Sequence, residues 1–455
     1  MRRAFLSAAC AIMLAGCAVG PDYKRPDVPA PPQHRADTAP QPQAASFGEA
    51  KWFDVFQDET LRGLIQEALK ANYDVRIAAQ RVLEAEGQLS ATKSGLYPQL
   101  GATASVTRDG VNSPIQTRGG VYGAAVWEID LFGKLRRASE AARAELLATK
   151  ENQNAVMQSL VSQVAAAYFG LREYDAELVY VRESIKTRTE SLRLVTARQV
   201  GGVATRLEVD QAQSLVASAQ ASAAQLESAI EQTENFINFL LGKQPGPVAR
   251  GKALEEQPKP PQVPAGLPSS LLDRRPDLRL VEQRLVAANA RVGVAKAAFF
   301  PSINLTAAGG YQSADLLGVV NRSGGAYSLG GFIDLPIFDA GRRAGNYKSA
   351  KAQYQQMLID YQKAIHGAFR EVADALIGYQ KAQEYRASQE LFAKTLRDQS
   401  MLSNQRYRGG VTSYLEVLDT ERQRLTAEQL LAQAQLLELN SIIQLYKALG
   451  GGWQI

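Results

Sequence analysis

The sequence predicts a mainly α-helical protein that contributes four β-strands to a transmembrane β-barrel shared between several copies of the chain. Three observations lead to this fold class. The 455-residue chain repeats its own motifs about 205 residues apart, in units far longer than those of a solenoid. Each copy contains a very long stretch without proline. Each copy also interrupts its helices with two runs of alternating apolar and polar residues.

The two copies carry the same motifs in the same order. The matching pairs are Tyr73-Asp74-Val75-Arg76 with Pro276-Asp277-Leu278-Arg279, Ile129-Asp130-Leu131 with Ile333-Asp334-Leu335, Gly201-Gly202-Val203 with Gly409-Gly410-Val411, and Leu241-Gly242 with Leu449-Gly450. A fixed order of shared motifs indicates one architecture built by duplication, so each motif can be examined twice.

The N-terminus has the pattern of a bacterial lipoprotein signal. A basic start precedes an apolar run that is too short to cross a bilayer and ends in Leu14-Ala15-Gly16-Cys17, which resembles a lipobox. We therefore expect cleavage before Cys17, a covalent lipid on its thiol, and sorting to the outer membrane because Ala18 follows. A plain secretory signal with a chance cysteine is the alternative. Since Cys10 lies inside the signal, the mature chain would have no disulfide and no cysteine metal site.

Proline-rich segments divide the chain. We expect a signal peptide at 1–16, a lipid-anchored Pro-rich arm at 17–50, a first repeat at 51–244 with a β-hairpin at about 99–130, a Pro-rich connector at 245–268, a second repeat at 269–450 with a β-hairpin at about 302–336, and a C-terminal tail at 451–455.

Long helices are expected between these segments. Residues 136–199 contain no proline and Gly170 as the only glycine, and residues 342–408 again contain no proline. About 64 helical residues would extend roughly 95 Å, several times the length of an ordinary globular helix. After Gly201-Gly202, apolar and small residues alternate by four and three, which predicts a coiled-coil seam. An ordinary long coiled coil is the alternative.

Two short hairpins are expected within this helical pattern. Their apolar faces are Leu100, Ala102, Ala104 and Val106; Val121, Gly123, Ala125, Trp127 and Ile129; Ile303, Leu305, Ala307, Gly309 and Tyr311; and Tyr327, Leu329, Gly331, Ile333 and Leu335. Strands of about ten residues with one apolar face are typical of an outer-membrane barrel. Four strands cannot close a barrel and open edges are not tolerated in lipid, so an oligomer is expected. Two hairpins packed on a soluble core are the alternative.

Composition and motifs give no sign of an enzyme. The net charge of +5 is mild and its cations are interspersed with acids, which argues against nucleic-acid binding. Nothing pairs the two histidines, His34 and His366, and no phosphate-binding glycine loop or Ser/His/Asp set is present. We expect no catalytic residue, no metal site and no cofactor apart from the lipid on Cys17.

At this point the chain resembles the TolC-like outer-membrane efflux proteins, in particular the lipoprotein branch of the OprM/NodT type. The resemblance rests on Cys17-Ala18-Val19-Gly20-Pro21-Asp22-Tyr23, Trp52, Asp58-Glu59-Thr60-Leu61, Leu267-Pro268-Ser269, Asp273-Arg274-Arg275-Pro276-Asp277 and the paired glycine turns. It implies a homotrimer in which three sets of four strands close one twelve-stranded barrel in the outer membrane. The long helices would form a periplasmic α-barrel about 100 Å deep.

The resemblance also assigns a gate. It places the turns at Gly201, Gly202, Gly409 and Gly410 at the periplasmic tip. Glu416 and Asp419 match two carboxylates that ring the closed aperture, while Leu415 and Arg422 match positions near the neck. Such a ring would favour cations and resist anions. A solvated pair of helix acids is the alternative, and the first repeat has Glu208 but Gln211 at the matching places.

A latch is implied beside this aperture. Tyr407 matches a tyrosine that holds the tip shut by bonds to the neighbouring hairpin. Candidate partners in this latch are the neighbouring Arg406, and Glu208 or Asp210 on the other hairpin.

The function implied is an exit duct. It would work with a periplasmic adaptor and an inner-membrane pump of the RND class, and would carry drugs or other small molecules to the outside. Two alternatives stay open at this point, a duct for type I-like protein secretion and a periplasmic lipid-anchored adaptor.

Overall fold

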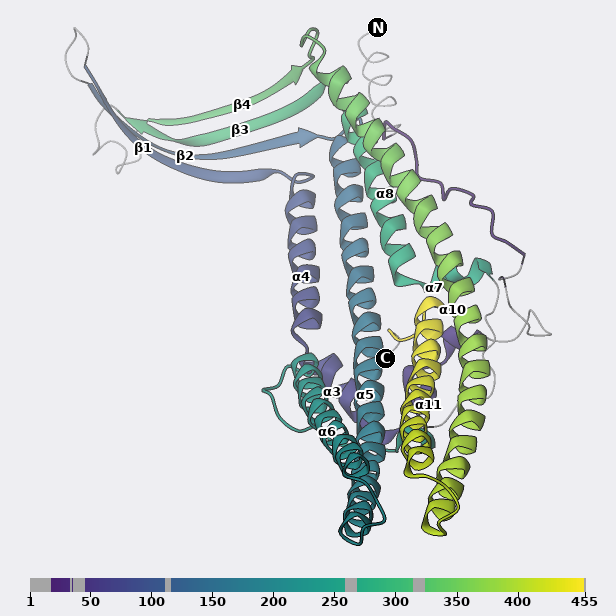
Figure 1. Cartoon of the computed structure of the whole chain (residues 1–455). Coiled ribbons are helices and arrows are strands. Elements are labelled where there is room, and N and C mark those ends of the chain that lie inside the picture. Colours follow the sequence, from purple (N-terminus) through teal and green to yellow (C-terminus); the bar gives the residue numbers. More distant parts are fainter. Residues whose placement is uncertain are drawn as a thin grey trace. The chain divides into compact units, whose positions relative to one another are not determined.

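The computed structural model describes residues 18–32, 35, 46–110, 116–257, 268–313 and 324–453 (Figure 1). Cys17 and His34 therefore lie outside the described residues. In chain order the elements are η1 (Phe47–Glu49), α2 (Trp52–Val55), α3 (Glu59–Ala71), α4 (Tyr73–Ser94), β1 (Gln99–Asp109), β2 (Gln116–Ile129), α5 (Lys134–Val200), α6 (Arg206–Leu240), η2 (Leu254–Glu256), η3 (Pro268–Ser270), α7 (Leu271–Arg274), α8 (Pro276–Ala297), β3 (Ser302–Ser313), β4 (Gly325–Asp334), α10 (Arg342–Arg408) and α11 (Tyr414–Ala448).

From α4 and from α8 onward, the two halves of the chain contain the same order of elements with the same helix lengths, whereas α3 has 13 residues and α7 has four. The helices before the hairpins, α4 and α8, have 22 residues each. The long helices α5 and α10 have 67 residues each, and the returning helices α6 and α11 have 35 each. No described helix is both long and apolar enough to cross a bilayer.

One antiparallel sheet joins the halves. Its strand order is β1-β2-β3-β4, so the central pair, β2 and β3, links the first hairpin to the second. The register places Leu100 opposite Ala125, Ala125 opposite Ala307, and Ala307 opposite Leu329. Because directly opposed residues share one face of a sheet, the four apolar faces expected from the alternation form one continuous apolar face.

Contacts divide the chain into two units, and each draws on both halves. The first contains the segment up to Val28, Ala79–Asn152 and Asp277–Ala364; the second contains Pro29–Ala78, Gln153–Pro276 and Ile365–Ile455. The main hydrophobic core belongs to the second unit, where fully buried Ile65, Tyr168 and Tyr446 lie in one cluster. Repeats in the sequence therefore do not coincide with units in space.

In the second unit, Asp58 ties the first helices to the segment after α6. One carboxylate oxygen caps α3 by accepting from the backbone N–H of Thr60 and Leu61. The other accepts from the Tyr168 hydroxyl at 2.9 Å, the Lys252 N–H at 2.9 Å and the Gln257 side chain at 3.0 Å. Burial opposes ionisation of Asp58, but these hydrogen bonds outweigh it and hold the pKa of this carboxyl below its usual range.

In the first unit, residues 20–25 of the arm lie along one face of α8. The Asn289 side chain donates to the Pro21 carbonyl at 2.9 Å, and Gly20 crosses directly over Gly293. Further along, Tyr23 donates to Glu282 at 3.2 Å and Arg25 pairs with the same carboxylate at 2.6 Å. Towards α5, Asp22 pairs with buried Arg137 at 2.6 Å.

Candidate functional site

The two helix-to-helix turns are built in the same way. Gly202 and Gly410 have φ angles of 76° and 74°, a conformation that favours glycine at the end of a helix. In each turn the backbone N–H of the residue after this glycine donates a hydrogen bond to a carbonyl of the preceding helix. Val203 donates to the Arg198 carbonyl at 2.8 Å, and Val411 donates to the Arg406 carbonyl at 3.0 Å. Both turns are Schellman motifs, so each helix ends and its partner begins within a few residues.

The returning helices begin differently. Thr205 and Glu208 form a reciprocal capping box at the start of α6, with the Thr205 N–H donating to the Glu208 carboxylate at 2.6 Å. At the start of α11, Ser413 makes no side-chain cap, and the Thr412 hydroxyl donates to Glu416 instead. Each hairpin therefore uses its first carboxylate to support its own turn.

Within the chain, the candidate latch groups have other partners than those expected. Arg406 lies 3.6 Å from Glu416 on its own hairpin, while Asp210 pairs with Arg206 at 2.9 Å on α6. Glu208 is engaged in its capping box. None of these contacts joins one hairpin to the other.

At the candidate aperture, both acids have a cation close by. Glu416 lies near Arg406, and Asp419 pairs with Arg422 at 3.0 Å. The Asp419 and Arg422 side chains are 51% and 71% exposed, so solvent screens their attraction and the pair contributes at most about 1 kcal/mol. Leu415 beside them is also exposed. All four predicted residues thus lie on the solvent-accessible surface of one chain.

Tyr407 joins the two hairpins through its ring. The Arg198 guanidinium of α5 lies 4.8 Å from the ring centroid, and the Tyr414 ring of α11 lies 5.3 Å away. Tyr407 belongs to a buried cluster that includes Val195 of α5 and Ala212 of α6. Burial raises the pKa of the Tyr407 hydroxyl, and Arg198 offsets part of that effect. Among the described residues this buried hydroxyl has no hydrogen-bond partner.

Arg198 was missed by reasoning from the sequence. An arginine near a helix end normally reads as a solvated cation. The repeats contained a signal, because Arg198 and Arg406 occupy the same place before the paired glycines. The two arginines make different contacts. Arg198 lies over the Tyr407 ring of the other hairpin, whereas Arg406 lies near Glu416 of its own hairpin.

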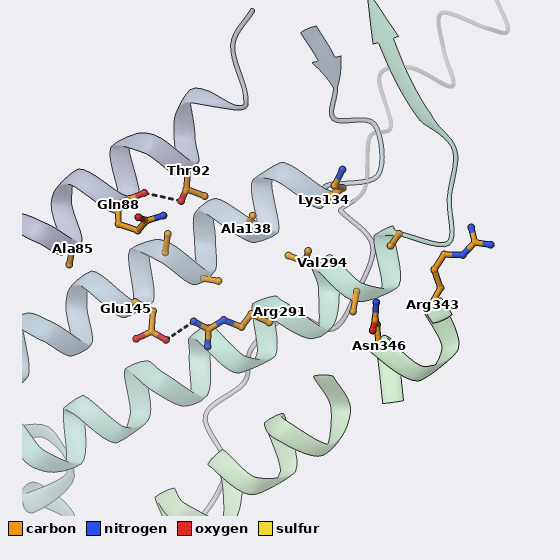
Figure 2. Close-up of a pocket in the computed structure, with 14 residues that line it drawn as sticks. Ala85, Gln88, Thr92, Lys134, Ala138, Glu145, Arg291, Val294, Arg343 and Asn346 are labelled. Atoms are coloured by element: carbon orange, nitrogen blue, oxygen red, sulfur yellow. Dashed lines mark hydrogen bonds and ion pairs between the residues drawn. The ribbon is translucent and has the colours of Figure 1, made fainter. Parts of the chain in front are cut away.

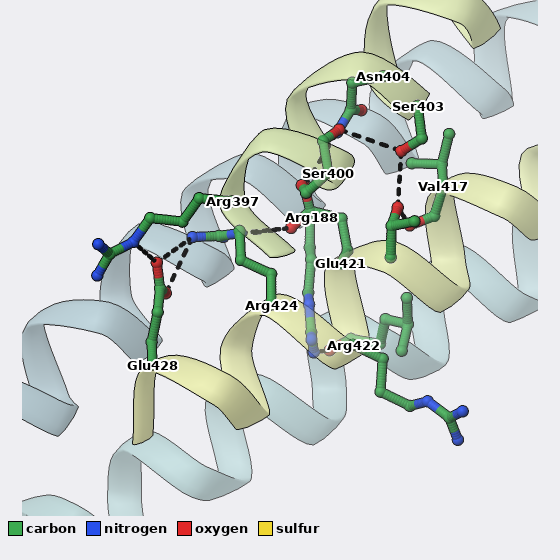
Figure 3. A network of polar contacts seen from close by, with 12 residues as sticks. Arg188, Arg397, Ser400, Ser403, Asn404, Val417, Glu421, Arg422, Arg424 and Glu428 are labelled. Carbon is green, nitrogen blue, oxygen red and sulfur yellow. Dashed lines mark hydrogen bonds and ion pairs between the residues drawn. The ribbon is translucent and has the colours of Figure 1, made fainter. Parts of the chain in front are cut away.

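A buried polar network locks α10 to α11 near this tip (Figure 3). Arg424 reaches Glu421 at 3.2 Å and Glu428 at 3.0 Å, and Arg397 of α10 reaches Glu428 at 2.7 Å. The Ser400 hydroxyl donates to Glu421 at 2.5 Å. Because members of the network come from both helices, it fixes the two against each other.

Arg188 of α5 lies beside this network and is buried. It donates to the Leu215 carbonyl of α6 at 3.0 Å, and burial lowers its pKa while the negative charge of Glu421 opposes the shift. Among the described residues, the Arg188 Nε is buried without a hydrogen-bond partner. Sequence reasoning had singled out neither Arg188 nor the acids of the network.

The described part of the chain contains no group of three or more His, Cys, Asp or Glu side chains that could hold a metal ion. The candidate site consists of two helix-to-helix turns, exposed acids and a buried tyrosine that contacts both hairpins.

Comparison with known proteins identifies the family of the chain. The family described as outer membrane efflux protein matches residues 64–243 and 267–451. The cation efflux system protein CusC of Escherichia coli O6:H1 is 36% identical over 449 residues, covering 98% of this chain and 97% of that protein. The solvent efflux pump outer membrane protein SrpC of Pseudomonas putida is 37% identical over 459 residues, with the same coverage.

A solved structure shares the fold as well. The open state of the Neisseria gonorrhoeae MtrE outer membrane channel is 32% identical, with a TM-score of 0.88, and covers 96% of this chain and 99% of that one. The predictions of a TolC-like fold, of an outer-membrane location and of an efflux channel are confirmed. The chain therefore belongs to the outer membrane efflux protein family.

Proposed function

We propose that three copies of the chain form the exit duct of a tripartite efflux system, a passive conduit with a gate at the helical tips. The main observation behind this proposal is the sheet with its two open edges. In the described part of the chain, β1 and β4 are the outer strands of a four-stranded sheet, and each has a partner on one side. Open strand edges are not tolerated in lipid, so β1 of one copy pairs with β4 of the next, and three copies close twelve strands.

The faces of the strands support the same arrangement. Leu100, Tyr327 and Leu329 lie on the continuous apolar face and are 84%, 86% and 79% exposed in the single chain. Such a face is costly in water and suits the lipid side of a barrel.

Lipidation of Cys17 is part of the proposal. Its support is the Leu14-Ala15-Gly16-Cys17 pattern and the docking of the next residues, since the Val19 N–H donates to the Phe132 carbonyl at 3.0 Å. Phe132 lies between the end of β2 and the start of α5. The lipid would thereby enter the bilayer beside the strands.

The gate would open by movement of one hairpin against the other. The α10–α11 network keeps that hairpin rigid, so opening must break contacts between hairpins, above all Arg198 on the Tyr407 ring. A partner that binds the separated hairpins more tightly than the packed ones shifts the population to the open state. In the closed trimer, Glu416 and Asp419 of three chains would surround the axis and favour cations.

The partners would be a periplasmic adaptor and an inner-membrane pump of the RND class. Val203 and Val411, at matching places of the two tips, are 69% and 71% exposed, a repeated apolar surface suited to an adaptor. The similar proteins are named for efflux of cations and of solvents, which favours small-molecule cargo over a secreted protein. The match to the outer membrane efflux family favours the duct over the adaptor itself.

Disulfide cross-linking tests the shared barrel. The sequence contains two cysteines, Cys10 and Cys17, so a cysteine at Thr103 of β1 can be paired with single cysteines at Ala326, Ser328 or Gly330 of β4. Oxidation of one of these double variants in membranes should give a covalent trimer on a non-reducing gel. Cross-linked dimers that never extend to trimers, or monomers throughout the scan, would refute the shared barrel.

A further inference from the structure

A pocket of about 570 Å³ lies just below the strands, between α4, α5, α8 and α10 (Figure 2). This volume is in the range of pockets that hold drug-sized ligands. Seven of its fourteen lining residues are alanine or valine, including Ala138 and Ala142 of α5 and Val294 and Ala295 of α8. All lining residues belong to the first unit of the chain. The pocket thus offers an apolar floor in a volume that suits a small molecule.

Three cations line the rim of the pocket, Lys134, Arg291 and Arg343, and each is paired with a carboxylate. Lys134 pairs with Glu128 at 2.9 Å, but among the three carboxylates only Glu145 belongs to the lining residues, so the cations lie nearer the floor than most of their counter-charges. Arg291 pairs with Glu145 at 2.8 Å across the pocket, and their side chains are 52% and 38% exposed, so both can still reach a ligand (Figure 2). Arg343 is paired with Asp339, yet its Nη1 is buried without a hydrogen-bond partner among the described residues. The charges therefore favour an anion over an apolar floor.

The pocket and the arm lie on opposite faces of α8. The arm contacts Glu282, Asn289 and Gly293, whereas the pocket uses Arg291, Val294, Ala295 and Ala298. Two residues along a helix correspond to about 200° of rotation, so Asn289 and Arg291 point in nearly opposite directions. If the arm leads to a lipid outside the wall, as the proposed function requires, the pocket faces the interior of the duct.

We propose that this pocket is a transient binding site for small amphiphiles that carry one anionic group, such as an aromatic sulfonate or carboxylate. The apolar body lies on the alanine floor and the anion meets Arg291 and Lys134, which releases part of the Arg291–Glu145 and Lys134–Glu128 contacts. This inference rests on the proposed function only for the direction in which the pocket faces; binding itself depends on the chemistry of its lining.

Two related dyes separate the charge from the apolar contact. The probes are 8-anilino-1-naphthalenesulfonate and N-phenyl-1-naphthylamine, which has the same rings without the sulfonate. Their fluorescence is titrated against the full-length protein in lipid nanodiscs, with empty nanodiscs as the blank. Arg291→Gln should weaken binding of the sulfonate about three- to fivefold, the size expected for a half-exposed charge contact. Glu145→Gln should strengthen it about twofold.

Three further variants control the experiment. Arg291→Lys keeps the charge and should retain most of the affinity. Ala142→Leu fills the floor and should weaken both dyes. Lys150→Gln removes a cation of the same helix that pairs with Glu86 outside the pocket, and should change neither dye. Trimer bands on a gel confirm that each variant is assembled.

The proposal is overturned if the two dyes respond alike to Arg291→Gln and Glu145→Gln, or if neither responds. The second result would also be obtained if a neighbouring copy fills the pocket. Ionic current through wild-type protein in a planar bilayer would continue in either case, so failure of the pocket is distinguishable from failure of the duct. Block of that current by the sulfonate dye, lost in Arg291→Gln, is the expected sign that the pocket faces the lumen.

Discussion

Replacing Arg424 with methionine removes the cation that lies between two buried carboxylates at the α10–α11 tip. The guanidinium contacts Glu421 and Glu428, and the three side chains are 10%, 5% and 3% exposed. Methionine keeps much of the length and apolar volume of the arginine stem, so the change acts mainly on charge.

The structure sets the size of the effect. After the change, Glu428 keeps Arg397 at 2.7 Å, but Glu421 keeps only the neutral hydrogen-bond donors Ser400 and Asn404 and the charge of the neighbouring Arg188, so the lower end of the usual range applies. A buried carboxylate that loses its cation destabilises a protein by about 3–5 kcal/mol. Since 1.4 kcal/mol is a factor of ten, local opening of this hairpin should become roughly a hundredfold or more frequent.

Hydrogen exchange followed by mass spectrometry measures how often this hairpin opens in the intact protein. Backbone amides of residues 397–408 and 414–428 should exchange faster by that factor in Arg424→Met, and those of the strands should not. Arg422→Met is the matched control, because its ion pair is exposed and its loss should change exchange less than about fivefold.

A second variant separates charge from packing. Arg424→Met combined with Glu421→Gln removes the uncompensated charge and should recover much of the lost protection. Wild-type exchange in the single variant, or a double variant that exchanges as fast as the single one, would contradict the account of a rigid α10–α11 hairpin.

Three further predictions concern stability and pH. Asp58→Asn has one oxygen fewer to accept five hydrogen bonds and should destabilise the second unit by about 2–4 kcal/mol. Because the folded pKa of Asp58 is lowered, its contribution is present above about pH 4 and is lost as the pH falls further. Thermal melts of the helical circular dichroism should therefore differ less between wild type and variant at pH 3 than at pH 7. Tyr407→Phe keeps the ring under Arg198 and loses a hydroxyl without a partner, so proteolysis at the tips should match wild type. Tyr407→Ala removes the ring and should make the tips several times more sensitive. Burial, and then the neighbouring Glu177, raises the pKa of Glu173 to about 8, so the folded state loses stability as pH rises from about 4.5 to 8. Glu173→Gln stays neutral, and its melting temperature should fall less than that of wild type between pH 6 and pH 9.

Much of the fold follows from short-range signals. Absence of proline over 136–199 predicted a helix that the structure extends to Lys134–Val200, and glycine pairs marked where the long helices end. Alternation predicted which residues of each strand share a face, because side chains in a strand have a period of two. The pairing of β2 with β3 does not follow from alternation, since it joins segments nearly two hundred residues apart.

The site was predictable only in part, for reasons of the same kind. The turns at Gly202 and Gly410 are local and were located from the sequence. The partners of Asp58 and of Tyr407 depend on which helices lie next to each other, and no local pattern contains that information. Arg424 has Glu421 three residues before it and Glu428 four residues after it, which looks like an ordinary solvated helix face, yet the structure buries it.

The central claim is that the chain forms a conduit whose narrowest point is ringed by Glu416 and Asp419. Single-channel current in planar bilayers, with wild type beside the Glu416→Ala, Asp419→Ala double variant, tests it most directly. We predict small cation-selective steps from wild type, and larger, less selective steps from the variant, because removal of six carboxylates from a trimeric neck removes the field that selects cations. Equal step size and selectivity in the two proteins would contradict the placement of the gate, and no steps from either would contradict the conduit.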